Sequence, residues 1–192
     1  VGICQYLPSA LGLLVEKEVE IMGNALKEPK RPFTAILGGA KVSDKIGVIE
    51  NLLSIADKVL IGGGMMYTFL KAKGYNTGNS LLEEDKVDLA GMILEKAKDK
   101  ILLPVDTVVA REFKNDSEFF TTDADKIPDG YMGLDIGQKT VDMFADIIKN
   151  SKTIIWNGPL GVFEMDNFAK GTNEIARAIA ANKDALSIIG GG

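Results

Sequence analysis

The chain has 192 residues, of which 46% are hydrophobic and 26% charged, a composition typical of a globular protein with one core. Its 22 basic and 27 acidic residues give a net charge of -5, which argues against a nucleic-acid binder that neutralises many phosphates. The absence of histidine and the single cysteine, Cys4, exclude Ser-His triads, histidine-based zinc sites and an internal disulfide. No apolar stretch approaches the roughly 20 residues of a membrane helix. We expect a cytoplasmic protein with no membrane partner.

Neither end of the sequence resembles a natural terminus. Val1 is not a start methionine, and Gly192 interrupts a glycine-rich turn. We therefore expect a chain that is cut at both ends.

Apolar residues between Leu7 and about Lys27 recur at helical spacing, which predicts one long amphipathic helix. Pro29 and Pro32 break this helix and lead into the first strand. Beyond them strands and helices alternate. The expected elements are strand 33–37, a helix at about 43–54, strand 58–61, helix 65–73, a helix at about 83–99, strand 101–105, a helix at about 138–149, strand 153–156, a helix at about 167–181 and strand 186–189. This alternation predicts an α/β fold with a mainly parallel sheet.

Two local patterns add detail to these elements. Ser80 and Glu83 match a capping box, which predicts that they satisfy the first N–H groups of the helix that follows. Between residues 106 and 137 helical periodicity is lost, and the apolar pairs 108–109 and 119–120 predict a short antiparallel hairpin on the rim of the sheet.

The aspartates at 123, 125 and 129 superficially suggest a calcium loop. Counted from Asp123, however, Pro128 stands at the glycine position of such a loop and Leu134 stands where the bidentate glutamate belongs. We therefore interpret this segment as an acidic surface loop without a metal.

Four apolar strands end on glycine-containing turns, at residues 38–39, 62–64, 157–159 and 190–192. In open α/β sheets ligands bind outside the carboxyl ends of the strands, where bare backbone can approach a phosphate or a flat ring. The pattern predicts a nucleotide-sized anionic ligand. The alternative is close packing of strand against helix, or a flexible turn.

Lys41 and Lys45 follow the first of these turns at a spacing of i and i+4, which would place both on one face of a helix. Two lysines at a glycine-rich helix start predict contact with a phosphate. The alternative is a solvated helix face neutralised by Asp44 and Glu50. The segment matches neither the P-loop nor the dinucleotide-binding fingerprint.

The third turn, Asn157 to Pro159, leads through an apolar stretch to Glu164. Glu164 could accept hydrogen bonds from ribose hydroxyls, while Pro159 and Val162 offer flat apolar contact. The alternative is a tight turn followed by a carboxylate early in a helix, near its positive dipole end.

Residues 37–45, 61–65, 102–106 and 156–164 together resemble the phosphoglycerate kinase family, because their motifs occur in the family's order and spacing. The resemblance is to the carboxyl-terminal, nucleotide-binding half. It implies an interdomain hinge helix at 1–29 and a Rossmann-like three-layer αβα domain at 30–192, incomplete at its carboxyl end. The implied activity is glycolytic phosphoryl transfer between ATP or ADP and 3-phosphoglycerate or 1,3-bisphosphoglycerate, with Mg²⁺ on the nucleotide, in a monomer.

The resemblance also implies roles for individual residues. Lys41 would be catalytic and stabilise the transferring phosphoryl group, and Lys45 would hold nucleotide phosphates. The implied nucleotide-binding residues are Gly39, Ala40, Lys41, Lys45, Gly63, Gly64, Leu81, Gly133, Leu134, Asn157, Pro159, Val162, Glu164, Gly190, Gly191 and Gly192. The family's magnesium-holding aspartate and its phosphoglycerate-binding lobe are not among the 192 residues. We therefore expect no metal site in this chain and no turnover by it alone.

Two other functions stay open. A non-catalytic module could bind an adenine nucleotide and thereby control docking of the helix at residues 7–27 onto a partner. A dinucleotide-dependent dehydrogenase is disfavoured, because no G-x-G-x-x-G motif follows a strand.

Overall fold

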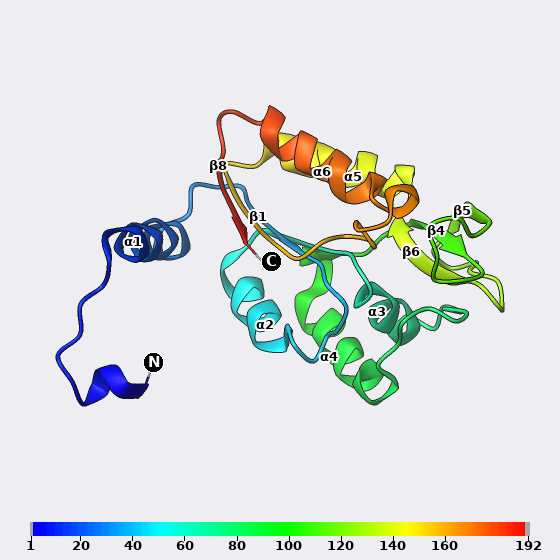
Figure 1. The fold of residues 1–192 in the computed structure, drawn as a ribbon, viewed down its shortest axis with the longest axis horizontal. Coiled ribbons are helices and arrows are strands. Elements are labelled where there is room, and N and C mark those ends of the chain that lie inside the picture. Colours follow the sequence, from blue (N-terminus) through cyan, green and yellow to red (C-terminus); the bar gives the residue numbers. More distant parts are fainter. Residues whose placement is uncertain (1, 191–192) are drawn as a thin grey trace.

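The computed structural model describes residues 2–190, and its centre is a five-stranded parallel sheet (Figure 1). The strand order is β3-β2-β1-β7-β8. These strands are β1 (Phe33–Leu37), β2 (Lys58–Ile61), β3 (Ile101–Leu102), β7 (Thr153–Asn157) and β8 (Leu186–Gly190). The first strand lies at the centre of this order and is buried along its whole length.

Helices cover both faces of this sheet, so the predicted three-layer αβα fold is confirmed (Figure 1). One face carries α2 (Ile46–Ile55), α3 (Met66–Ala72) and α4 (Val87–Ala97), and the other carries α5 (Gln138–Asn150) and α6 (Lys170–Ala181). Short 3-10 turns lie at Gly2–Gln5, Glu84–Lys86, Lys98–Lys100 and Asp166–Phe168. Over residues 2–190, none of the helices combines the length and the apolar character needed to cross a bilayer.

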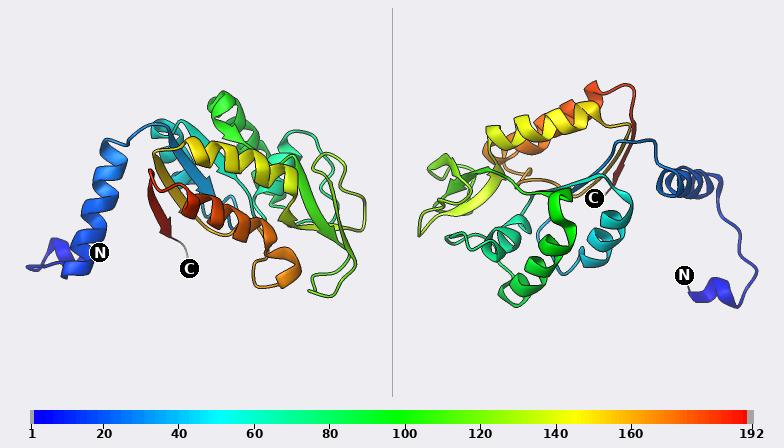
Figure 2. Two further views of the ribbon diagram at one scale, coloured as in Figure 1. Left: turned by 90° about the horizontal axis from the view of Figure 1, so that it is seen from above. Right: turned by 180° about the vertical axis from the view of Figure 1, so that it is seen from behind.

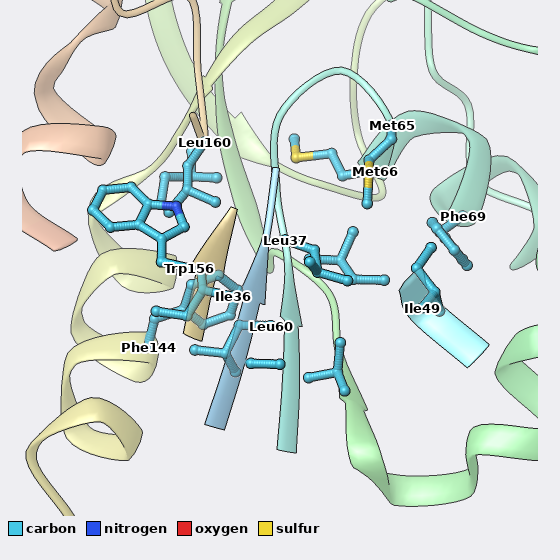
Figure 3. Close-up of a cluster of buried hydrophobic side chains, with 14 of the residues drawn as sticks. Ile36, Leu37, Ile49, Leu60, Met65, Met66, Phe69, Phe144, Trp156 and Leu160 are labelled. Atoms are coloured by element: carbon cyan, nitrogen blue, oxygen red, sulfur yellow. The ribbon is translucent and has the colours of Figure 1, made fainter. Parts of the chain in front are cut away.

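The core forms on both faces of the sheet because successive strand residues point to opposite sides. Figure 3 shows Ile36 on the side of Phe144 from α5, while Leu37 lies on the side of Ile49 from α2 and Phe69 from α3. All five side chains are completely buried. Removing these apolar surfaces from water holds the helices on the sheet and fixes the ends of the strands.

The strand order reverses between β1 and β7, which are neighbours in the sheet although they lie far apart in the sequence. The chain leaving β1 enters α2 on one face, whereas the chain leaving β7 leads to α6 on the other face (Figure 1). The two loops therefore diverge at the carboxyl ends of the strands. A crevice at such a switch point is the usual ligand site of an open α/β sheet.

A second, antiparallel sheet lies at the end of the domain, with the order β5-β4-β6 (Figure 1). Its strands are β4 (Asp106–Ala110), β5 (Phe119–Asp123) and β6 (Met132–Ile136). The predicted hairpin is confirmed, since Val109 pairs with Phe120. Strand β6 was not predicted, because Gly133 and Asp135 are poor strand formers. The predicted strand 101–105 ends early, at Leu102, shortly before Pro104.

Most of helix α1 (Leu13–Lys27) stands clear of the sheet domain in all three views (Figures 1 and 2), although Leu26 near its carboxyl end packs against the core. The prediction of a helix from Leu7 was wrong at its start, because residues 7–12 are not helical. Pro8 restricts Leu7 away from helical geometry, and Gly12 has a low helix propensity. The apolar side chains there are also exposed, so no packing compensates for this weak propensity.

The predicted start of α2 was wrong by three residues, since the helix begins at Ile46 rather than near 43. The helix expected from about 83 begins as the 3-10 turn Glu84–Lys86 and continues as α4 from Val87. The capping box is also wrong: the Ser80 hydroxyl accepts a hydrogen bond from the N–H of Gly133, at 2.9 Å. The carboxylate of Glu83 accepts N–H groups from the loop after β1. Distant backbone groups have therefore taken the place of the local cap.

Candidate functional site

A cavity of about 510 Å³ opens at the switch point between β1 and β7. The loops after β1, β2 and β7 form one side, and β6 with the segment before α4 forms the other. The lining residues are Gly39, Ala40, Gly63, Gly64, Tyr67, Asn79, Leu81, Phe113, Met132, Gly133, Leu134, Pro159, Leu160, Gly161, Val162 and Glu164. The structure thus brings together predicted residues from all three loops and from β6.

The glycine-rich loops pack directly against one another through their backbones. The N–H of Gly39 donates to the carbonyl of Pro159, and the N–H of Gly63 donates to that of Leu160, both at 3.0 Å. Gly63 has a φ of +66°, and a Cβ there would lie 2.6 Å from the nitrogen of Gly39. Close packing of loop against loop therefore explains this glycine, rather than the strand-against-helix packing considered from the sequence. The same packing leaves bare backbone on the cavity wall.

Lys41, Lys45 and Asn157 form what we call the charged end of the site. The Nζ of Lys45 donates to Oδ1 of Asn157, which links the loop after β1 to the end of β7. Lys41 is exposed and lies between Ala40 in the cavity wall and buried Val42. The prediction that both lysines share a helix face was wrong, because α2 begins only after Lys45. They lie on the loop that precedes the helix.

Tyr67, Leu81, Gly133 and Leu134 form what we call the apolar end of the site. The hydroxyl of Tyr67 donates to Oγ1 of Thr107 at 2.8 Å, and Thr107 in turn donates to the carbonyl of Asp135. Burial raises the pKa of the Tyr67 phenol above its usual range, so this ring is neutral.

Gly133 is required at the apolar end because of its contact with Tyr67. A Cβ on Gly133 would lie 1.8 Å from the Tyr67 hydroxyl oxygen. The bare backbone of β6 and the tyrosine ring therefore lie in direct contact. Together they give the cavity a flat apolar surface.

The loop after β7 closes the cavity from the side of α6. The N–H of Val162 donates to the carbonyl of Leu134 at 2.8 Å, which holds this loop on β6. Glu164 is exposed and lines the cavity, at a position before the 3-10 turn Asp166–Phe168. It is therefore not a carboxylate within the first turn of a helix. The chain places a carboxylate at the open side of an otherwise apolar cavity.

Asp135 is a buried carboxylate directly behind the cavity. Its Oδ2 accepts the N–H of Gly171, near the start of α6, at 2.7 Å, and Oδ1 accepts the N–H of Ile136. Burial raises the pKa of Asp135 to about 7, although both hydrogen bonds act to lower it. A Cβ on Gly161 would lie 2.2 Å from Oδ1 of Asp135, so this carboxylate supports the loop that lines the cavity.

Sequence reasoning missed several residues of this site. They are Tyr67, Asn79, Phe113, Met132, Asp135, Leu160 and Gly161. Only Asp135 carried a readable signal, as a single carboxylate within an otherwise apolar segment. The others look like ordinary core or loop residues, and only the fold brings them to the cavity.

The fourth glycine turn lies apart from the cavity lining. Gly190 ends β8 and pairs in register with Asn157 of β7. A Cβ on Gly190 would meet only the Nδ2 of Asn157, at 4.0 Å. Gly190 therefore adjoins the charged end through Asn157. The predicted site residues Gly191 and Gly192 lie outside the described residues.

The fit of the chain to a magnesium ion can be tested on its acidic side chains. Between residues 2 and 190 there is no group of three or more Asp, Glu, Cys or His side chains arranged to hold a metal ion. In the acidic loop, hydrogen bonds from Lys139 and Lys126 lower the pKa of Asp123 to about 2. The described residues therefore offer no metal cage built from three or more protein ligands.

Fold and site together define an αβα domain with a candidate ligand site at its switch point, and this site has a charged end and an apolar end. The sequence model of the family described as "Phosphoglycerate kinase" matches residues 1–192. The chain therefore belongs to the phosphoglycerate kinase family.

Individual relatives agree with this family assignment. Phosphoglycerate kinase of Enterococcus faecalis is 62% identical over 186 residues, which cover 97% of this chain and 47% of the relative. Phosphoglycerate kinase of Fusobacterium nucleatum is 65% identical over 184 residues, which cover 96% of this chain and 46% of the relative. The structure of phosphoglycerate kinase from Coxiella burnetii superimposes with a TM-score of 0.91 at 42% identity, covering 94% of this chain and 47% of that one. The chain thus spans about half the length of the relatives it matches.

Proposed function

We propose that this chain is the nucleotide-binding part of a phosphoglycerate kinase, which transfers a phosphoryl group between ATP or ADP and 3-phosphoglycerate or 1,3-bisphosphoglycerate. One observation carries the proposal: residues predicted from four separate segments line one cavity, and Lys41 and Lys45 lie on the loop that borders it. Membership of the family supports the same reaction.

In this proposal the adenine base enters the apolar end of the site. The backbone of Gly39, Ala40, Gly63 and Gly64 would face one side of the ring, because no side chain larger than a methyl group projects from these positions. The side chains at the apolar end would enclose the rest of the base. Binding there rests on shape and on the removal of apolar surface from water.

Ribose and phosphates would follow toward the open side and the charged end. Glu164 is a suitable acceptor for the ribose hydroxyls, since its carboxylate lines the cavity and is exposed. Pro159 and Val162 would contact the sugar and the base edge. Lys45, held by Asn157, would bind the phosphates at the amino end of α2, where the helix dipole also favours negative charge.

Lys41 would act on the phosphoryl group during transfer. Phosphoryl transfer depends mainly on positioning and on stabilisation of the charge on the transferring group. A carboxylate acceptor is already ionised near neutral pH, so the reaction requires no histidine base. We propose that magnesium arrives on the nucleotide phosphates, since the described acidic side chains form no cluster for it. We also propose that the protein is a cytoplasmic monomer.

The first experiment is calorimetric titration of the 192-residue chain with ADP. We expect saturable binding of one nucleotide and weaker binding by the Leu81→Ala variant, whose truncated side chain lines the cavity. A matched control is Met92→Ala, which removes an exposed side chain on α4. We expect the 192 residues alone to bind nucleotide without turnover. Normal conversion of phosphoglycerate and ATP by this chain would contradict that division of labour.

The exposed side chains of α1 support a second candidate, an adenine-nucleotide module that controls docking of this helix. Leu14 and Val19 are 71% and 57% exposed, so an apolar surface is open to a partner. A coupled assay of phosphoglycerate turnover on the complete gene product separates the two functions. Turnover supports the kinase, whereas nucleotide binding without transfer supports the docking module.

A further inference from the structure

Glu83 makes an unusual set of hydrogen bonds to a loop that lies about 40 residues earlier in the sequence. Its Oε2 accepts the N–H groups of Val42 and Ser43, at 2.5 and 3.2 Å, and its Oε1 accepts the hydroxyl of Ser43 at 2.5 Å. One carboxylate thus binds three donors on two consecutive residues. Hydrogen bonds to an ionised acceptor are shorter and stronger than neutral ones.

The loop that Glu83 holds is the one that carries the charged end. Lys41 directly precedes Val42, which is completely buried, and Lys45 follows two residues after Ser43. The backbone on which both lysines stand is therefore fixed at its middle by Glu83. Lysine itself has a flexible stem, so its ammonium group can be placed only if its backbone is held.

The segment that carries Glu83 also forms part of the apolar end. Asn79 and Leu81 line the cavity, and a Cβ on Gly64 would lie 2.9 Å from Cδ2 of Leu81. The N–H of Glu83 donates to Oγ1 of Thr68, which is buried on α3. The backbone of Glu83 is thus bound to the domain core, while its side chain binds the loop of the charged end.

The ionisation of Glu83 is consistent with this arrangement. Burial acts to raise its pKa, but the hydrogen bonds from Ser43 and Val42 outweigh that effect and lower the pKa below its ordinary value. Glu83 is therefore a carboxylate at neutral pH, with full strength as an acceptor.

We propose that Glu83 is a positioning residue that holds the backbone of Lys41 and Lys45 in register with the base-binding wall formed by Leu81. The inference rests on the proposed nucleotide site and goes beyond it, since Glu83 itself does not line the cavity. The two ends of the site are thereby coupled through one side chain. Removal of Glu83 weakens the contacts to phosphate while the contacts to the base persist.

The test compares ADP with adenosine, which carries no phosphate, by calorimetry on the 192-residue chain. We expect E83A to weaken ADP binding about tenfold, which is the order expected for the loss of one charge-assisted hydrogen bond. Adenosine binding should weaken by less than about twofold. E83Q keeps one oxygen acceptor and is expected to recover ADP binding to within about threefold of wild type. E84A removes the adjacent exposed carboxylate as a matched control and leaves both affinities unchanged.

The opposite outcomes overturn the inference. They are an unchanged ADP affinity in E83A, an equal loss of ADP and adenosine, or an E83Q variant as weak as E83A. If the wild-type chain binds neither ligand, the proposed function fails, and hydrogen exchange of the free chain then decides the role of Glu83. We expect the amides of Val42 and Ser43 to exchange at least about tenfold faster in E83A, with the core amide of Ile36 unchanged. Unchanged exchange at Val42 and Ser43 overturns the inference independently of nucleotide binding.

Discussion

The two ends of the candidate site are built by different means. The apolar end consists of bare backbone in direct contact with the buried side chains of Tyr67 and Leu134, together with the half-exposed Leu81, as where Gly133 packs on Tyr67. The charged end consists of long side chains on a loop, and its geometry depends on hydrogen bonds such as that between Lys45 and Asn157. Shape at the apolar end is thus a property of the core, whereas charge placement depends on a few polar contacts.

This difference predicts different consequences of substitution. Changes at the charged end should affect turnover and leave the fold intact. Changes at the apolar end should affect nucleotide affinity and stability together, because the same contacts serve both.

The largest effect is expected for Lys41→Ala in the complete enzyme. Turnover should fall by about 100-fold or more, because the lost interaction stabilises charge that develops in the transition state. The Michaelis constant for ATP should change by less than about fivefold, since ground-state binding rests on other contacts. Steady-state kinetics measure both constants. Lys71→Ala, an exposed lysine in the last turn of α3, is the control, and normal turnover of K41A would refute the catalytic role.

The next effect is expected for Gly133→Ala at the apolar end. The new methyl group would lie 1.8 Å from the Tyr67 hydroxyl, so the ring or β6 must shift. We expect ADP binding to weaken about tenfold and the free energy of unfolding to fall by about 1–3 kcal/mol. Calorimetry and urea denaturation measure these changes. The double variant with Tyr67→Phe should recover part of both. Gly91→Ala, which meets only an ordinary van der Waals contact inside α4, should leave ADP binding unchanged and should not lower the free energy of unfolding.

A smaller effect is expected for Glu164→Ala, at the open side between the two ends. The affinity for ADP and adenosine should fall about three- to tenfold, since the ribose loses one hydrogen-bonded carboxylate, while adenine, which lacks the sugar, should bind as before. Competition titrations with the three ligands distinguish these cases. The exposed Glu118→Ala is the control. Equal weakening of adenine would mean that Glu164 shapes the base pocket instead.

The smallest effect on nucleotide affinity is expected for Asp135→Asn. This substitution should instead change how the free energy of unfolding depends on pH. Burial raises the pKa of Asp135 to about 7, while Glu174 and Lys170 nearby act on it in opposite directions. Because the folded chain retains this proton after the unfolded chain has lost it, wild-type stability falls as pH rises between about 4 and 7.

Asparagine does not titrate, so D135N lacks this contribution. From pH 5 to pH 7 the wild type should lose about 1–2 kcal/mol relative to D135N, with no further relative change above about pH 8. Urea denaturation of both proteins at a series of pH values measures the difference. A pH-independent difference would show that Asp135 does not titrate in this range.

Helical and strand periodicity sufficed to predict the main sheet and the helices on its two faces. The predictions failed where a side chain that favours a local helix cap binds a donor far away in the sequence instead. Ser80 and Glu83 match a helix cap, yet Gly133, Val42 and Ser43 supply the donors that they bind. Helix α1 is a different case. Its apolar spacing predicts a helix, but the spacing does not show which surface the helix would pack against.

The candidate site divides in the same way. Its glycines and the two lysines could be read from the sequence, because they follow strand ends in a recognisable order. Tyr67 could not, and the single carboxylate of Asp135 stands out in its apolar segment without showing its role. Both roles depend on contacts with Gly133, Gly161 and Gly171 that lie far away along the chain.

The amino-acid sequence by itself determined the α/β class, the family, and the segments that meet at the switch point, because these follow from periodicity and from motif order. Only the tertiary structure decided that the glycine loops interlock, that Gly133 rests on Tyr67, and that Glu83 holds the loop of Lys41. The physical reason is that donors, acceptors and voids are matched in three dimensions. A residue's best partner is the nearest one in the folded chain, which local sequence does not specify.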